Sequence, residues 1–162
     1  NKVRPGPIRV EADEVTYNLH IILRFELENA LINNKLKVED LQSAWRAKMK
    51  KYLGVEPKTD SEGVLQDVHW SWGSFGYFPT YALGNLYAAQ FTNKMRQDLD
   101  VDQLVSRGEL GTMLAWLREK IHQHGGLYWP SELVQRVTRE KLNPKYFLSY
   151  IREKYGKIYK LR

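Results

Sequence analysis

The chain contains no cysteine among its 162 residues. This absence excludes disulfide bonds, thiolate metal ligands and cysteine nucleophiles, and it fits a reducing cytoplasm, which is the location we expect. Histidine is also scarce, and its four residues are His20, His69, His122 and His124. No pair has the His-Glu-x-x-His spacing of a helical zinc site. We therefore expect no catalytic metal to be held by this segment alone.

Long apolar runs are missing too. The run Leu19-His20-Ile21-Ile22-Leu23 is soon interrupted by Arg24 and Glu26, far short of the roughly 20 residues that cross a bilayer. We expect no membrane segment. The chain begins at Asn1 rather than at a methionine, and we expect it to be a fragment or a processed product. Its 43% hydrophobic content indicates a folded chain.

The net charge of +6 concentrates near the end of the chain. Tyr150, Tyr155 and Tyr159 are interspersed with lysines and arginines there. One interpretation is a solvated helix whose tyrosines pack inward while the basic side chains extend to water. The other is a nucleic-acid surface, but no nucleic-acid-binding motif accompanies the charge. We expect no nucleic-acid partner.

Helical periodicity dominates, and no pair of strands is predicted, so the expected fold class is all-α. The first helix should run continuously from Asp13 to Asn33, with a buried stripe formed by Val15, Leu19, Ile22, Leu23, Leu27 and Leu31. Further helices are expected at 38–53 with Gly54 as its C-cap, at 80–98 with Pro79 in its first turn, at 109–124 and 130–141, and from Pro144 onward. Residues 55–79 should be loop and short turns.

The most informative segment is Gly63-Val64-Leu65-Gln66-Asp67-Val68-His69-Trp70, followed by the aromatic stretch 73–81. Amide, carboxylate and imidazole groups embedded in aromatic residues are typical of a binding groove. Packing alone is the competing interpretation for His69, Tyr77 and Tyr81. The nearby glycines, which permit close approach of a ligand to the backbone, leave the two interpretations evenly matched.

A polar line also follows the first predicted helix. Asp13, Tyr17, His20 and Arg24 share one helical face, and Arg9 precedes it. One interpretation is an Arg9–Asp13 pair with a solvated face. The alternative is a groove wall that presents a guanidinium group to a carboxylate ligand.

Two motifs carry a family resemblance. Ile8-Arg9-Val10-Glu11-Ala12-Asp13 resembles the Ile-Arg-x-x-Ala-Asp signature of the carboxypeptidase Taq family, thermostable zinc carboxypeptidases of the His-Glu-x-x-His type. The segment 63–70 matches that family's Gly-x-x-Gln-Asp-x-His-Trp signature at every fixed position. The similarity extends over essentially the whole chain. Members of the family are about three times longer, so residues 1–162 resemble the C-terminal segment of the catalytic domain, without its metal-binding part.

The resemblance implies a helical fold like that of thimet oligopeptidase and neurolysin, and a homodimer when full-length. Zinc, or another divalent metal, would be bound upstream, and the substrates would be peptides with a free C-terminus, cleaved one residue at a time. The roles that it implies are oxyanion donor for Tyr81, with Tyr77 as second choice, substrate-backbone contact for His69, and substrate-carboxylate binding for Arg9. Asp13 would orient a zinc-ligating histidine, and Gln66 and Asp67 would buttress the loop or bind peptide backbone.

The alternative is a non-catalytic helical module that binds peptides or nucleic acid. If the chain is a fragment, apolar surface should be exposed where the missing part packs.

Overall fold

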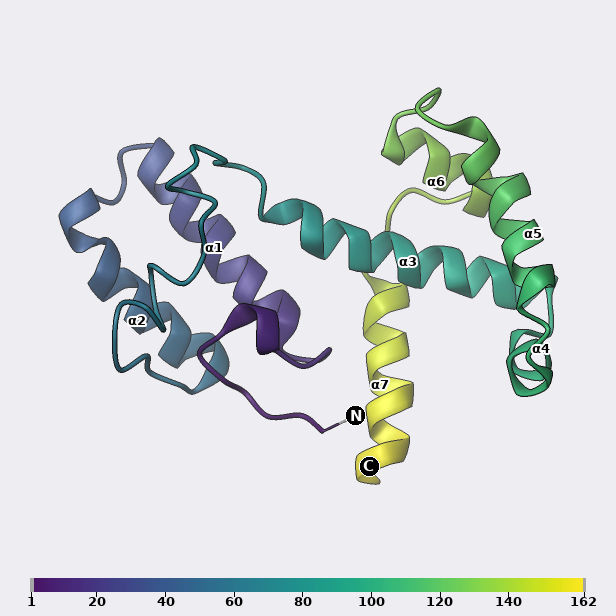
Figure 1. Ribbon diagram of the computed structural model, residues 1–162, viewed down its shortest axis with the longest axis horizontal. Coiled ribbons are helices and arrows are strands. Elements are labelled where there is room, and N and C mark those ends of the chain that lie inside the picture. Colours follow the sequence, from purple (N-terminus) through teal and green to yellow (C-terminus); the bar gives the residue numbers. More distant parts are fainter. Residues whose placement is uncertain (1, 162) are drawn as a thin grey trace. The chain divides into compact units, whose positions relative to one another are not determined.

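The computed structural model describes residues 2–161, and Figure 1 shows them as helices joined by turns. The α-helices are α1 (Tyr17–Ile32), α2 (Leu41–Leu53), α3 (Pro79–Asp98), α4 (Val101–Arg107), α5 (Leu110–Lys120), α6 (Pro130–Thr138) and α7 (Lys145–Tyr159). Short 3-10 helices are η1 (Arg9–Glu11), η2 (Val38–Asp40) and η3 (His122–His124). No strand occurs within this described range, which confirms the all-α prediction. The chain divides into two compact units, Asn1–Leu83 and Gly84–Arg162.

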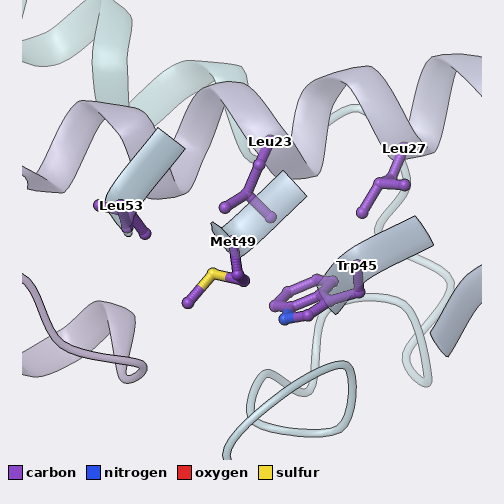
Figure 2. Packing of buried hydrophobic residues seen from close by; sticks show 5 residues of the cluster. All are labelled: Leu23, Leu27, Trp45, Met49 and Leu53. Carbon is purple, nitrogen blue, oxygen red and sulfur yellow. The ribbon is translucent and has the colours of Figure 1, made fainter. Parts of the chain in front are cut away.

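The core of the first unit lies between α1 and α2. Leu23 and Leu27 of α1 point toward side chains of α2 (Figure 2), and the buried cluster consists of Leu23, Leu27, Trp45, Met49 and Leu53. Helical spacing places each set on one face. Burying a side chain of this size contributes about 1.5–3 kcal/mol, so this contact anchors α1 for the site that its polar residues form.

The prediction that the first helix begins at Asp13 is wrong. Asp13 lies before α1, and its Oδ1 accepts hydrogen bonds from the N–H groups of Val15 and Thr16 at 3.0 Å each. The carboxylate thus satisfies amides that have no partner within the helix. The chain turns tightly after Asp13, and α1 begins at Tyr17.

The buried face of α1 also differs from the predicted stripe. It consists of His20, Ile21, Leu23, Arg24, Leu27 and Glu28. The prediction that Ile22 is buried is wrong, because 41% of it is exposed. Polar residues of this face point inward because the segment 67–70 supplies hydrogen-bonding partners for them, as described for the site below.

The connections that carry the site follow the predictions more closely. Gly54 ends α2 in the left-handed region, at φ 69°, where a residue without Cβ is favoured. Turns and bends span 58–78 with no strand, and Pro79 is the first residue of α3. This places Tyr81 in the first turn of α3, immediately after the aromatic loop.

In the second unit α4 was not expected. It is stabilised at its start by Asp100, whose side chain accepts from the Gln103 N–H, and it ends at Gly108 with φ 71°. Two predicted helices end early. The helix expected to His124 stops at Lys120, and the one expected to Lys141 stops at Thr138.

The basic C-terminal helix α7 buries one of its four tyrosines. Tyr155 is buried, whereas Tyr150 and Tyr159 are 39% and 44% exposed. The interpretation with inward tyrosines therefore applies to Tyr155 only. Among the described residues, no helix combines the length and apolarity needed to span a membrane.

Candidate active site

Asp67 lies between two arginines. Nε and Nη2 of Arg9 donate to Oδ1 at 3.0 and 2.7 Å. Nε of Arg24 donates to Oδ2 at 2.8 Å, and its Nη2 lies 2.7 Å from the same oxygen. Each carboxylate oxygen therefore receives one guanidinium group. This arrangement ties the segment before α1, α1 itself and the 63–70 motif together.

Burial makes this arrangement electrostatically strong. Arg24 is fully buried and Arg9 is 7% exposed. Burial lowers the pKa of Arg24 to about 10, against the opposing charge of Asp67, and the side chain remains a cation at neutral pH. Burial alone would raise the pKa of Asp67, but the hydrogen bond from Arg9 and the charge of Arg24 bring that pKa below its ordinary value. All three groups are therefore ionised near pH 7.

Aromatic faces complete the surroundings of both cations. The Arg24 guanidinium lies 4.6 Å from the ring centroid of Trp45 and 5.4 Å from that of Phe78. The Arg9 guanidinium lies 5.1 Å from the ring of Tyr81. Rings in this position attract a cation through their quadrupole while they exclude water. The rings thus fix both guanidinium groups without competing for their hydrogen bonds.

Gln66 fastens the loop to the N-terminal segment. Its Oε1 accepts from the Arg9 N–H at 2.8 Å, and its Nε2 donates to the carbonyl oxygens of Pro7, Glu62 and Gly63. The side chain satisfies backbone groups of two segments almost sixty residues apart in sequence. Within the described structure, the contacts of Gln66 hold the loop and the N-terminal segment together.

His69 and Tyr81 are directly bonded. The distance from His69 Nε2 to the Tyr81 hydroxyl is 3.0 Å, and the tautomer of the ring decides which group donates. The imidazole packs against Phe78 with the ring planes tilted and the centroids 4.3 Å apart, and Tyr77 lies edge-on to Tyr81 at 5.5 Å. The structure therefore brings His69, Tyr77 and Tyr81 together, with the Arg9 guanidinium 5.1 Å from the Tyr81 ring.

Asp13 is engaged elsewhere. Its Oδ2 accepts from the Arg4 N–H at 2.8 Å, while Oδ1 caps the turn before α1. Although burial opposes it, the hydrogen bonds from Arg4 and Thr16 lower the pKa of Asp13. The interpretation in which Arg9 pairs with Asp13 is wrong, since Asp67 provides both of the carboxylate contacts of Arg9. The solvated face is wrong too, because His20 and Arg24 are fully buried.

Two further residues, Glu28 and Trp70, support the site and were not assigned a role from the sequence. Glu28 is 3% exposed, and its Oε1 accepts from the Trp70 indole N–H at 2.8 Å. Trp70 in turn meets Trp45 edge-on and stacks on Phe75. The signal was present in the sequence, since Arg24 and Glu28 are one helical turn apart on the same face as His20. A charged residue in that position indicates a buried partner from another segment.

No group of three or more histidine, aspartate or glutamate side chains is placed to hold a metal ion among residues 2–161. The chemistry that these residues support is recognition of a charged or polarised ligand: two arginines, a hydrogen-bonded histidine–tyrosine pair and apolar rings that exclude water.

The family model described as carboxypeptidase Taq (M32) metallopeptidase matches residues 1–155. Carboxypeptidase 1 of Bacillus subtilis (strain 168) is 51% identical over 99% of this chain and 32% of its own length. Thermostable carboxypeptidase 1 of Thermus thermophilus is 52% identical over 98% of this chain and 31% of its own length. The chain thus spans about a third of these relatives.

The comparison with solved structures agrees with this family match. The crystal structure of the M32 carboxypeptidase from Deinococcus radiodurans R1 superposes with a TM-score of 0.96 at 40% identity, covering 99% of this chain and 33% of that one.

Replacing the shared carboxylate should be costly. Asp67→Asn leaves two buried guanidinium groups without their counter-ion, and the free energy of unfolding should fall by about 3–5 kcal/mol in chemical denaturation. Adding Arg24→Met removes the more deeply buried charge, so the double variant should recover at least about 1 kcal/mol of this loss. Additive losses in the double variant would contradict the coupling.

His20 should make stability depend on pH. Burial, followed by the charges of Arg24 and Arg9, lowers the pKa of His20 from 6.5 to about 4. As the pH falls from 6.5 to about 4, the unfolded chain takes up a proton on His20 that the folded chain does not. The free energy of unfolding therefore falls on acidification. His20→Gln should remove up to about 3 kcal/mol of that pH-dependent loss, measured as unfolding free energy at both ends of the interval. The matched substitution at exposed His122 should leave the slope unchanged.

Proposed function

The chain belongs to the carboxypeptidase Taq (M32) metallopeptidase family, and from this premise we propose that it is part of a metal-dependent carboxypeptidase. The reaction is release of single amino acids from peptides with a free C-terminus. The observation that carries the proposal is the family match over residues 1–155, together with relatives that are named carboxypeptidases. The match favours an enzyme over the non-catalytic binding module.

Zinc is the metal that we propose. Since the described residues bring no ligand set together, its ligands belong to polypeptide outside this segment, and this segment acts on the substrate. We further propose a homodimer in the cytoplasm for the full-length protein, as expected from the resemblance and the absence of cysteine.

Tyr81 is the proposed oxyanion donor. Peptide hydrolysis develops negative charge on the scissile carbonyl oxygen, and a positioned phenol lowers the barrier by donating to it. The hydrogen bond of 3.0 Å with His69 supports this role. If Nε2 carries the proton, the imidazole donates to the tyrosine oxygen and leaves the phenolic hydrogen for the substrate. His69 thereby orients Tyr81 and lies close enough to it to meet the same stretch of substrate backbone.

Arg9 is the proposed carboxylate-binding residue. An arginine carries five N–H groups, and the contacts with Asp67 and Tyr17 use three of them. One N–H on each Nη atom remains for a ligand, and the ring of Tyr81 lies 5.1 Å from the guanidinium. A carboxylate bound there would place the last peptide bond toward the tyrosine. Asp67 and Gln66 hold Arg9 in this orientation.

Tyr77 is the second candidate donor, since it is 50% exposed next to Tyr81. For Asp13 we keep the proposal that it orients a metal-ligating histidine from the rest of the protein. Its observed hydrogen bonds with Arg4, Val15 and Thr16 also give it a capping role in this segment.

Tyr81→Phe in the full-length enzyme should lower kcat by about 10²–10³ with little change in KM. The variant keeps the ring beside Arg9 and deletes the donor alone, so thermal unfolding should be nearly unchanged. Tyr77→Phe is the matched control and should leave kcat within a few-fold of the parent. The reverse pattern would transfer the role to Tyr77.

Arg9→Ala should harm recognition of the free C-terminus selectively. Losing a charge-assisted bidentate contact should reduce kcat/KM for a free-acid peptide roughly 30- to 1,000-fold. The same peptide amidated at its C-terminus is a poor substrate for the parent and should respond little. Equal losses for both peptides would show that Arg9 serves the Asp67 cluster alone.

A further inference from the structure

Buried polar side chains follow one line of helix α1. Each is four residues from the next, and none is more than 5% exposed; the line consists of Thr16, His20, Arg24 and Glu28. Side chains at this spacing lie one above another on a helix. The line holds four of the six buried polar or charged residues found between residues 2 and 161. Because buried polar groups are nearly always hydrogen-bonded, each atom of the line needs a partner.

The two ends of this line differ in their hydrogen bonding. Arg24 and Glu28 have partners from the segment 67–70, as described above. Neither ring nitrogen of His20 has a hydrogen-bonding partner among the described residues, and the hydroxyl oxygen of Thr16 has none there either. Three buried polar atoms without a protein partner thus lie within one turn of α1.

The chemistry of these three atoms defines what could satisfy them. A neutral imidazole has one donor and one acceptor nitrogen, and a threonine hydroxyl both donates and accepts. An unpaired buried donor or acceptor gives up its hydrogen bonds to water for nothing, and folded proteins have little stability to spare for such losses. The ligand at this position must therefore both donate and accept hydrogen bonds.

Burial and charge determine which ligand fits. His20 is fully enclosed by this chain, so a group as large as a substrate does not reach it. The guanidinium groups of Arg24 and Arg9 lie close enough for their charges to act on the imidazole. Both arginines share the single carboxylate of Asp67, which leaves an excess of positive charge that would repel a metal cation. A small neutral molecule that donates and accepts is water.

We propose that Thr16 and His20 bind internal water, with one molecule bridging the threonine hydroxyl and a ring nitrogen of the histidine. Residues four apart on a helix have Cβ atoms about 5–6 Å apart. Two hydrogen bonds of about 2.8 Å through one water oxygen match this span. The bound water satisfies the neutral imidazole without adding charge beside the Arg9–Asp67–Arg24 cluster. This inference does not rest on the peptidase activity.

Crystallography of the full-length protein that carries this chain tests the bridge directly. At about 1.5 Å resolution, the electron density should show an ordered water within about 3.2 Å of both the Thr16 hydroxyl and a His20 ring nitrogen. Thr16→Val keeps the shape of the side chain and removes the hydroxyl, so this water should be lost or displaced. Thr16→Ser keeps the hydroxyl and should keep the water.

Thermal unfolding of the same proteins gives an independent measure. Thr16→Val should lower the Tm by at least about 2 °C, because the water loses a partner and the enclosed imidazole is less well satisfied. The Thr16 side chain makes no capping hydrogen bond, so the loss of a helix cap does not contribute. Thr92→Val, at an exposed position of α3, is the matched control and should shift the Tm by less than about 1 °C.

Three results would each overturn the proposal. A map without ordered water at this position would show that the enclosure is dry. A Tm that Thr16→Val leaves unchanged or raises would show that the hydroxyl has no partner. A protein group bonded to both Thr16 and His20 in the full-length molecule would take the place of the water. None of these measurements involves catalysis, so their outcome leaves the proposed function unaffected.

Discussion

The first unit depends on a single carboxylate. Asp67 neutralises two arginines that come from different segments, and without it the fully buried Arg24 would have no counter-ion. Burying charges is costly, and this cost is met only when each guanidinium has a well-placed anion. The loop that carries Asp67 must therefore close over α1. Closure also brings His69 toward Tyr81 and seats Trp70 against Glu28.

Rigidity is the functional result of this arrangement. Arg9 is held by Asp67 and Tyr17 on its guanidinium and by Gln66 on its backbone N–H. A side chain fixed in this way would lose little entropy on binding the carboxylate proposed above, because its orientation is already set. Tyr81 gains the same advantage from its position in the first turn of α3, where the backbone is already ordered.

Much of this could be read from the sequence, and the error at the inward face of α1 has a clear physical cause. Helical spacing found α2, its Gly54 cap and the loop before Pro79, because local rules govern these features. The two signature motifs singled out Arg9 and His69, and the family resemblance added Tyr81. The predicted buried stripe of α1 left out Arg24 and Glu28, although partners 43 and 42 residues away allow them to be buried. Periodicity carries no information about such distant partners.

The shared carboxylate also constrains how this segment can change over evolutionary time. Arg9, Arg24 and Asp67 are coupled, so a lineage that alters one of them first passes through a protein with an unpaired buried charge. Natural selection removes most such intermediates, because folded proteins have little stability to spare. The three positions are thus expected to persist together or to be replaced together, and their loss in a homologue would mark a rebuilt core of this unit rather than neutral drift.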